Sequence, residues 1–419
     1  MRILIFTLLL LVAVTSQVAA QRECISYDYE QKTLTDNPLL KEKIAEIANI
    51  AQRKIAARGG DIAGRPHQGT IITIPVVIHL LYNKAAENLS DERILSQIQV
   101  LNECFRRLSA DTVNTPAVFA GVAADCGIEF KLATSDPQGR RTNGIIRQYT
   151  PVTKWDINDD VKYASRAGAD AWDTKSYLNI WVCNLDRVAG YSSFPGGPEA
   201  TDGVVIAHSV FGKNTRGGYE QGKTAVHEIG HYFGLRHIWG DSFCGDDWVD
   251  DTPKQASFTP GCPSGVRQSC SNGKNGDMYM NFMDLTQDAC INLFTEGQKE
   301  RIRFLFVRGE SRHSLLSSKG LSAPTNSQPR PPEEVPPVVG EFRLYPNPAT
   351  NEILLDLSYD IRWMGRPIRI TNIQGQAVIQ VTVNAKVMKI DISRLTPGLY
   401  FLGTGIEHGD VVKQKFLKM

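Results

Sequence analysis

The sequence lacks an excess of charge of either sign. Its 419 residues include 46 Lys and Arg against 45 Asp and Glu, which gives a formal net charge of +1. A protein with so little net charge has no global field that would draw it onto nucleic acid or an anionic membrane surface. We therefore expect no nucleic-acid partner, and we expect any partner to be recognised by a local site.

Long apolar runs are nearly absent. The first extends from Ile3 to Val14, follows a charged tip at Arg2, and gives way to small residues at positions 18–20. About a dozen apolar residues are fewer than the roughly 20 that span a bilayer, so residues 1–20 are predicted to be a signal peptide rather than a membrane anchor. No second stretch of 18 apolar residues follows. We expect a soluble, exported protein without a transmembrane anchor.

Cysteine is sparse as well. Eight cysteines in 419 residues are too few for a fold held together mainly by disulfides. An exported protein nevertheless keeps the disulfides that it forms. Four of the eight lie between residues 244 and 290, so we expect disulfides to stabilise that segment. Four cysteines alone allow three pairings.

Composition separates the N-terminal part into two segments. Residues 21–68 are polar, contain one amphipathic helical stretch from about Leu39 to Ala57, and end in a glycine-containing loop, which is typical of a cleavable propeptide. β-Branched residues then begin abruptly at Ile71, and such a run marks the start of a folded domain. We place that domain at residues 69–315.

Strands and helices alternate within this domain. β-Branched and apolar runs predict strands near residues 71–78, 128–132, 145–149, 178–182 and 204–207. Ser90 is the predicted N-cap of a helix whose apolar residues recur at helical spacing from Ile94 to Phe105. Such alternation favours a mixed sheet backed by helices over a helix bundle.

Proline and short apolar runs mark the C-terminal part. Six prolines crowd residues 322–339, so residues 316–340 are predicted to form an extended, proline-rich linker. Residues 341–419 carry short alternating apolar runs between turn residues. This pattern predicts a small all-β sandwich.

One segment carries the chemistry of a metal site. His227 and His231 are four residues apart, so on a helix both imidazoles project from one face and can hold one cation. Gly234 can adopt the positive φ that ends a helix, and the resulting turn brings His237 to the same cation. Three imidazoles leave one tetrahedral position of a zinc ion open for water, as in catalytic sites. Glu228 is placed to take a proton from that water.

Chance is the alternative explanation for this histidine-rich helix. Given the His, Glu and Gly frequencies of this chain, the pattern H-E-x-x-H-x-x-G-x-x-H would arise in roughly one chain in 10^5. The pattern, followed by a methionine-containing turn, resembles the metzincin metallopeptidases. The candidate turn is Asn281-Phe282-Met283-Asp284, with Met283 beneath the metal. By itself Met283 would be an ordinary core methionine.

Residues 71–315 resemble the pappalysin branch of the metzincins. Beyond the zinc motif, the resemblance lies in residues 277–284, residues 290–298, Cys244 and residues 249–253. It implies an α+β catalytic domain with a twisted mixed sheet, an active-site helix and a Met-turn. It also implies the activity of a secreted zinc-dependent endopeptidase that is made as a zymogen and acts on extracellular proteins or peptides.

The same resemblance assigns further residues and contains one departure. It implies disulfides between Cys244 and Cys270 and between Cys262 and Cys290. The family usually carries a tyrosine two residues after the Met-turn methionine, thought to stabilise the tetrahedral intermediate, and this chain has Leu285 there. The alternative function is therefore a catalytically weak or inactive zinc-binding surface adhesin.

Cys24 closely follows the predicted signal peptide. Its thiolate could occupy the open zinc position as a cysteine switch and keep the zymogen silent until the propeptide is cut. The alternative is a spare thiol, or a disulfide partner for Cys104, Cys126 or Cys183.

Acidic residues crowd the loop after the zinc motif. Oxygen ligands of this kind suit a structural Ca²⁺, which relatives bind, and a solvated acidic loop is the alternative. The candidate ligands are Asp247, Asp250, Asp251 and Thr252.

Residues 341–419 resemble the type A sorting domain of the bacterial type IX secretion system. The similarity lies in residues 344–351, residues 395–400 and the terminal Lys415-Phe416-Leu417-Lys418. It implies export through the periplasm to the medium or the cell surface, with the type IX secretion machinery as a partner. The alternative is a carbohydrate- or surface-binding β-module. Extended protein or peptide substrates are expected to pair with an edge strand near residues 190–195.

Overall fold

The computed structural model describes residues 24–37, 40–42, 49, 53, 70–215, 218–328, 343–356, 367–385, 387–404 and 413–419. The predicted signal peptide, most of the predicted helix at 39–57 with its following loop, and residues 329–342 of the proline-rich region lie outside the described residues. Across the described ranges, no helix is long and apolar enough to cross a membrane.

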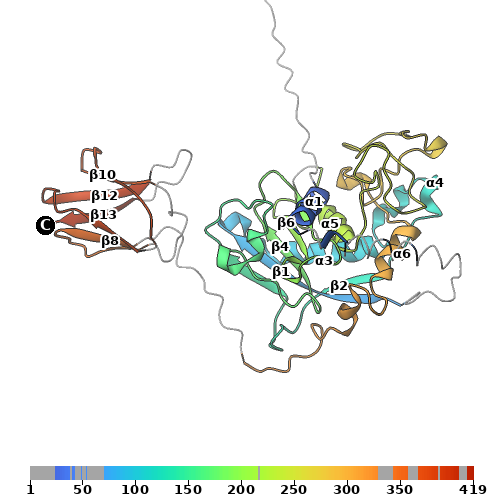
Figure 1. Ribbon diagram of the computed structural model, residues 1–419, viewed down its shortest axis with the longest axis horizontal. Coiled ribbons are helices and arrows are strands. Elements are labelled where there is room, and N and C mark those ends of the chain that lie inside the picture. The colour runs from blue at the N-terminus through green and yellow to red at the C-terminus, as the bar shows by residue number, and fades with distance from the viewer. Residues whose placement is uncertain are drawn as a thin grey trace, which may run out of the picture.

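A six-stranded sheet forms the centre of the N-terminal part (Figure 1). Its longest strand, β1 (Ile72–Tyr82), pairs in parallel with β2 (Ile128–Leu132) and β3 (Ile145–Tyr149) on one side and with β4 (Leu178–Cys183) on the other. Beyond β4 lie β6 (Val204–Ala207), which is also parallel, and β5 (Gly190–Ser192), which is antiparallel and forms the edge. The prediction of a mixed sheet is confirmed.

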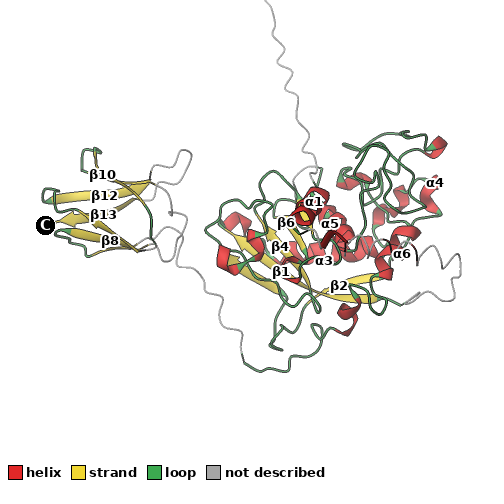
Figure 2. Ribbon diagram, viewed as in Figure 1, coloured by secondary structure: helices red, strands yellow, loops and turns green. Residues whose placement is uncertain are grey.

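Helices lie beside the strands of this sheet (Figure 2). Each face of the sheet has its own hydrophobic core. On one face, α3 (Asp91–Phe105) and α5 (Lys223–Tyr232) pack against alternate residues of β1 and β4. Ser90 caps α3 as predicted, because its hydroxyl accepts a hydrogen bond of 3.3 Å from the Arg93 amide. The intervening strand residues form a second core on the outer face, and this core includes Tyr29 of α1 (Ser26–Asp36).

β1 is longer than the strand predicted from the sequence. The prediction ended at Ile78, whereas the strand continues to Tyr82 and includes His79. His79 is buried, its Nε2 lies 2.9 Å from Oδ1 of Asn179, and its ring stacks on Trp181. A histidine whose polar atoms have partners fits a central strand, although it interrupts the apolar run that marks the strand in the sequence.

The helix α1 lies in the predicted propeptide and was not predicted. Tyr29 and Leu34 are its two buried hydrophobic side chains. A short, mostly polar helix is marginal in isolation and leaves little periodic signal in a sequence. α1 therefore depends on its contacts with the catalytic domain.

Two disulfides crosslink the irregular segment between α5 and α6 (Glu296–Phe304). One joins Cys244 to Cys270 and the other joins Cys262 to Cys290, which are the pairs that the family resemblance implies. A disulfide restricts the unfolded chain. It can therefore stabilise a segment whose backbone forms few regular hydrogen bonds.

The turn at Met283 is tied to two helices. The side-chain amides of Asn281 and Gln298 exchange hydrogen bonds of 2.9 and 3.0 Å, and Asn281 accepts a third from the Met283 amide at 2.8 Å. These bonds attach the turn to the first turn of α6. Met283 is fully buried under α5, where a Cβ on Gly230 would lie 2.4 Å from its Sδ. Helix and turn thus touch at a position that has no room for a side chain.

The C-terminal part contains two antiparallel sheets. One has the order β10 (Ala377–Thr382), β9 (Pro367–Thr371), β12 (Gly398–Thr404) and β13 (Lys413–Lys418), and the other has the order β11 (Val387–Asp391), β8 (Glu352–Asp356) and β7 (Arg343–Tyr345). Alternate residues of both sheets share one core, which includes Leu355, Ile370 and Phe416. The prediction of a small all-β sandwich is confirmed.

We predict that Gly230→Ala destabilises the catalytic domain. The new methyl group overlaps Met283 Sδ, and overpacking of this kind costs about 1–3 kcal/mol, which exceeds the roughly 1 kcal/mol that alanine gains over glycine in a helix. Thermal unfolding measures the effect. Gly121→Ala is the control, because no atom lies within 4 Å of its added Cβ. An unfolding midpoint for Gly230→Ala equal to or above that of the unchanged chain would contradict the prediction.

Candidate metal centre

The buried helix α5 positions the first two candidate ligands. All ten of its residues are buried. His227 and His231 lie one helical turn apart, so their side chains share one side of the helix. Their imidazole centroids are 4.8 Å apart.

A tight turn delivers the third candidate ligand. The φ of Gly234 is 75°, and the Leu235 amide donates a hydrogen bond of 3.0 Å to the carbonyl of Gly230. This left-handed conformation favours glycine. The chain turns back towards α5 at Gly234 and brings His237 to the other two histidines, as the position of this glycine predicts.

The three imidazoles converge on one point. Nε2 of His227 lies 3.1 Å from Nε2 of His231, and Nε2 of His237 lies 3.2 Å from each of them. A tetrahedral zinc ion with Zn–N distances of about 2.0–2.1 Å holds its nitrogen ligands about 3.3–3.4 Å apart. The spacing therefore fits zinc. Within the described ranges, these histidines and Cys24 form the one group of three or more His, Cys, Asp or Glu side chains that could hold a metal ion.

The opposite ring nitrogens fix the protonation of the histidines. Nδ1 of His227 lies 2.7 Å from the carbonyl of Phe282, and Nδ1 of His231 lies 2.8 Å from the carbonyl of Leu235. A carbonyl can only accept, so each Nδ1 carries the proton and each Nε2 offers its lone pair. Nδ1 of His237 faces a carboxylate oxygen, in Asp241.

Burial also favours the neutral form of the His231 imidazole. Desolvation, with a smaller effect of His237, lowers the pKa of His231 well below its usual value. The imidazole of His231 is therefore neutral and able to bind a metal at neutral pH.

Cys24 lies where a fourth ligand belongs. Its Sγ is 3.4 Å from Nε2 of His231, and its backbone forms a parallel bridge with Gly190 in the edge strand β5. Burial and the nearby charge of Glu228 raise the pKa of the Cys24 thiol well above its usual value. A thiolate at this position therefore requires a cation beside it.

The carboxylate of Glu228 is engaged by a residue that the sequence analysis missed. Ser26 donates a hydrogen bond of 2.7 Å from its hydroxyl to Oε2 of Glu228 and accepts one of 2.9 Å from the Ser192 amide. Glu228 is fully buried. The sequence feature that could have pointed to Ser26 is its position two residues after Cys24, the candidate fourth ligand.

Met283 and Leu285 are both buried. Met283 contacts α5 at Gly230, directly between the two helical histidines. Leu285 is 5% exposed, and its hydrocarbon side chain cannot donate a hydrogen bond. Met283 thus packs against the helix that carries two of the histidines, and position 285 has no phenol where the family resemblance leads us to expect tyrosine.

The structure does not gather the predicted calcium ligands into one cluster of carboxylates. Asp247 and Thr252 are buried and hydrogen-bonded to each other at 2.9 Å, whereas Asp250 is exposed. Asp251 accepts a hydrogen bond of 2.9 Å from the Gly297 amide through Oδ2, while its buried Oδ1 has no hydrogen-bond partner.

Four cysteines form no disulfide. They are Cys24, Cys104, Cys126 and Cys183. The last three are buried, and burial raises the pKa of each thiol. None of them pairs with Cys24, which was one alternative to the cysteine switch.

Family models match both parts of the chain. The model described as Pregnancy-associated plasma protein-A, which represents the pappalysin peptidases, matches residues 162–306. The model described as a secretion system C-terminal sorting domain matches residues 343–418. The two matches correspond to the two resemblances noted in the sequence.

Similar proteins match a larger share of the chain than the peptidase family model does. An extracellular metalloprotease of Pyricularia oryzae is 33% identical over 60% of this chain and 80% of its own length. Mature mirolysin of Tannerella forsythia, solved with a cleaved peptide, is 49% identical over 59% of this chain and 96% of that chain, with a TM-score of 0.58. Promirolysin of the same organism is 43% identical over 71% of this chain and 97% of that chain, with a TM-score of 0.64.

The larger coverage by promirolysin supports synthesis as a zymogen. The names of the relatives and the sorting domain agree with an extracellular location. With a histidine cluster suited to zinc and a catalytic part that aligns over most of these proteins, the chain belongs to the pappalysin family of metalloproteases and carries a C-terminal type IX secretion sorting domain.

Proposed function

We propose that this protein is a zinc endopeptidase in which His227, His231 and His237 hold the metal and Glu228 is the general base. The observation that carries the proposal is the convergence of three Nε2 atoms within 3.2 Å beside a buried carboxylate on the same helix. An intact Glu228 in this position argues against the inactive adhesin considered from the sequence.

The histidines and Glu228 have different roles in the proposed hydrolysis of the peptide bond. Zinc at the three imidazoles would polarise the scissile carbonyl and acidify water. Glu228 takes the proton of the attacking water and returns it to the leaving amine. The carbonyl acceptors at Nδ1 of His227 and His231 hold these rings in place.

The edge strand β5 is the proposed binding site for the substrate backbone. The leader segment, defined as residues 24–37, occupies this edge through the Cys24–Gly190 bridge and the hydrogen bond from the Ser192 amide to Ser26. An extended peptide can form equivalent backbone hydrogen bonds once the leader segment leaves. Mature mirolysin was solved with a cleaved peptide, which supports protein or peptide substrates here.

Latency is proposed to rest on Cys24 and Ser26 together. Cys24 Sγ occupies the fourth ligand position, and the Ser26 hydroxyl takes up the oxygen of Glu228 that must accept a proton. Removal of the leader segment releases both groups. The C-terminal sorting domain is proposed to engage the type IX secretion machinery and to play no part in peptide cleavage.

A structural Ca²⁺ in the acidic loop is proposed as a further cofactor. Its binding would have to draw the predicted ligands Asp247, Asp250, Asp251 and Thr252 together, because the carboxylates among them do not form one cluster in the described residues. The support is the buried carboxylate of Asp247 and the unpartnered, buried Oδ1 of Asp251. A buried oxygen without a partner, such as Oδ1 of Asp251, is costly, and a cation would satisfy it.

Glu228→Gln tests the catalytic assignment. Loss of the base is expected to lower kcat/KM on casein or gelatin by about 10²–10⁴-fold in the enzyme freed of its leader segment. A zinc chelator should abolish the activity, and added zinc should restore it. Glu92→Gln, at an exposed glutamate of α3, serves as the control. Chelator-insensitive cleavage, or full activity of Glu228→Gln, would sink the proposal.

Latency is tested in the uncut full-length chain. Cys24→Ala is expected to cleave casein slowly without processing, because the fourth ligand position opens while the rest of the leader segment still occupies β5. Ser26→Ala is expected to show a smaller gain because the thiol remains. Cys104→Ala, which removes a buried thiol remote in sequence from the histidines, is the control. Equal activity of all uncut forms would remove the switch.

Calcium binding is predicted to depend on pH. Burial raises the pKa of Asp247 to about 7, so protons compete with Ca²⁺ below that value. The rise in unfolding temperature caused by added Ca²⁺ should therefore be small near about pH 6 and larger near about pH 8. Asp251→Asn should abolish it, and Asp156→Asn, at an exposed aspartate, should not. A calcium effect that is absent, or unchanged in Asp251→Asn, would refute the site.

A further inference from the structure

The leader segment contacts β5 in two places, along its backbone edge and on its outer face. Gly190 and Ser192 face it in the cleft through the Cys24 bridge and the Ser26 hydroxyl. Tyr191 lies between them, and alternate strand residues point to opposite faces. Its side chain belongs to the outer core, where it meets Tyr29 from α1. α1 therefore reaches past the edge of the sheet to a second contact away from the histidines.

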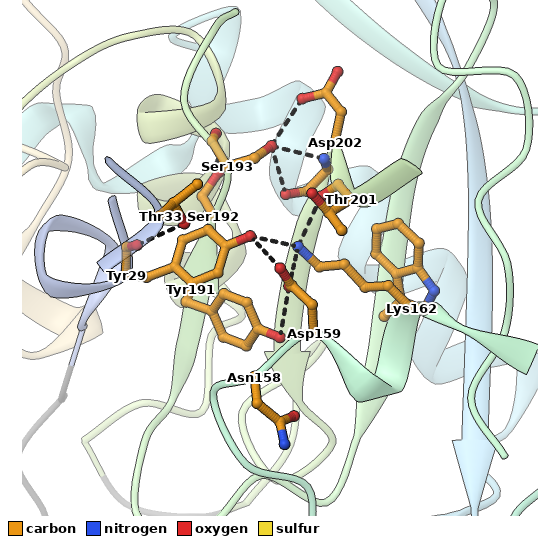
Figure 3. Close-up of polar contacts among 12 residues, drawn as sticks. Tyr29, Thr33, Asn158, Asp159, Lys162, Tyr191, Ser192, Ser193, Thr201 and Asp202 are labelled. Atoms are coloured by element: carbon orange, nitrogen blue, oxygen red, sulfur yellow. Dashed lines mark hydrogen bonds and ion pairs between the residues drawn. The ribbon is translucent and has the colours of Figure 1, made fainter. Parts of the chain in front are cut away.

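Figure 3 shows the surroundings of Tyr29. Its ring centroid lies 4.9 Å from that of Tyr191, and its hydroxyl donates a hydrogen bond of 2.6 Å to Oδ2 of Asp159. Only 6% of Tyr29 is exposed. Burial and the charge of Asp159 raise the pKa of Tyr29 well above its usual value, so the phenol stays protonated and donates.

A buried lysine completes these surroundings. Lys162 is 0% exposed, and its Nζ lies 2.8 Å from Oδ1 of Asp159 and donates a hydrogen bond of 2.8 Å to the carbonyl of Thr201. The same Nζ lies 5.1 Å from the ring centroid of Tyr29 and 5.0 Å from that of Tyr191. These distances are within the range of cation–π attraction.

All groups that surround Tyr29 in this way come from the catalytic domain. The ion pair between Asp159 and Lys162 has a backbone partner in Thr201 and does not require the leader segment. An aromatic ring, a cation and a carboxylate acceptor together select a ring that carries a hydroxyl group. Phenylalanine would lose the hydrogen bond to Oδ2 of Asp159, whose side chain is 18% exposed, and a hydrogen bond to a charged group contributes more than one between neutral groups.

We propose that Asp159, Lys162 and Tyr191 form a binding site for a para-hydroxyphenyl group, separate from the catalytic cleft, which anchors the leader segment through Tyr29. The anchoring role rests on the proposed zymogen function. The site itself involves neither the histidines nor Glu228. Opening the Cys24 contact alone therefore does not free the leader segment.

The test measures how often α1 leaves its position in the full-length chain. Trypsin can cut after Lys32, which is exposed within α1, only when the helix opens locally. Tyr29→Ala is expected to speed this cleavage at least about tenfold and Tyr29→Phe by a smaller factor, because only the hydroxyl contact is lost. Tyr27→Ala, in the same helix, is the matched control. Mass spectrometry follows the cut, in the presence of a zinc chelator so that the chain's own activity plays no part.

Chemical rescue identifies the ligand class. p-Cresol, which is the tyrosine side chain without its backbone, is expected to slow the cleavage of Tyr29→Ala, and toluene is expected not to. Equal rescue by toluene, or no effect of Tyr29→Ala beyond that of Tyr27→Ala, would overturn the proposal. Because added trypsin supplies the readout, such a failure leaves the peptidase assignment untouched, and a failed peptidase assay leaves this site untouched.

Discussion

Three nitrogen lone pairs directed at one point inside the protein are the constraint on which this structure depends. Like partial charges in a buried site repel one another, so the arrangement persists only because each ring is held from behind. The acceptors are the carbonyls of Phe282 and Leu235 and the carboxylate of Asp241. They belong to separate stretches of chain, which explains why the irregular region after α5 must be fixed by disulfides and by the Asn281–Gln298 amide pair.

The histidine cluster could be predicted from the sequence because its signals are local. His227, Glu228, His231, Gly234 and His237 fall within eleven consecutive residues, and one helical turn together with the turn at Gly234 relates them. The central strands were equally readable, since both faces of the sheet are covered and the strands form continuous apolar runs.

The features that the sequence did not reveal depend on contacts between distant segments. Ser26 meets Glu228 across 202 positions and Tyr29 meets Asp159 across 130. Neither Ser26 nor Tyr29 belongs to a pattern with a period, and α1 forms only where the catalytic domain covers it. Gly230 is a related case. A Cβ at this position would lie 2.4 Å from Met283 Sδ, and this contact between distant segments, which explains the glycine, is not visible in the sequence.

The two contacts of the leader segment with β5, at Gly190 and at Tyr191, have a kinetic consequence. Cys24 precedes α1 and Tyr29 lies within it, so the two contacts of the leader segment act as a bivalent ligand. When the thiol of Cys24 departs, the ring of Tyr29 keeps it at a high effective concentration near the histidines. Rebinding is then intramolecular and outcompetes a dilute substrate. Activation becomes a cooperative event, in which the helix must melt or be cut within its own length before the cleft opens.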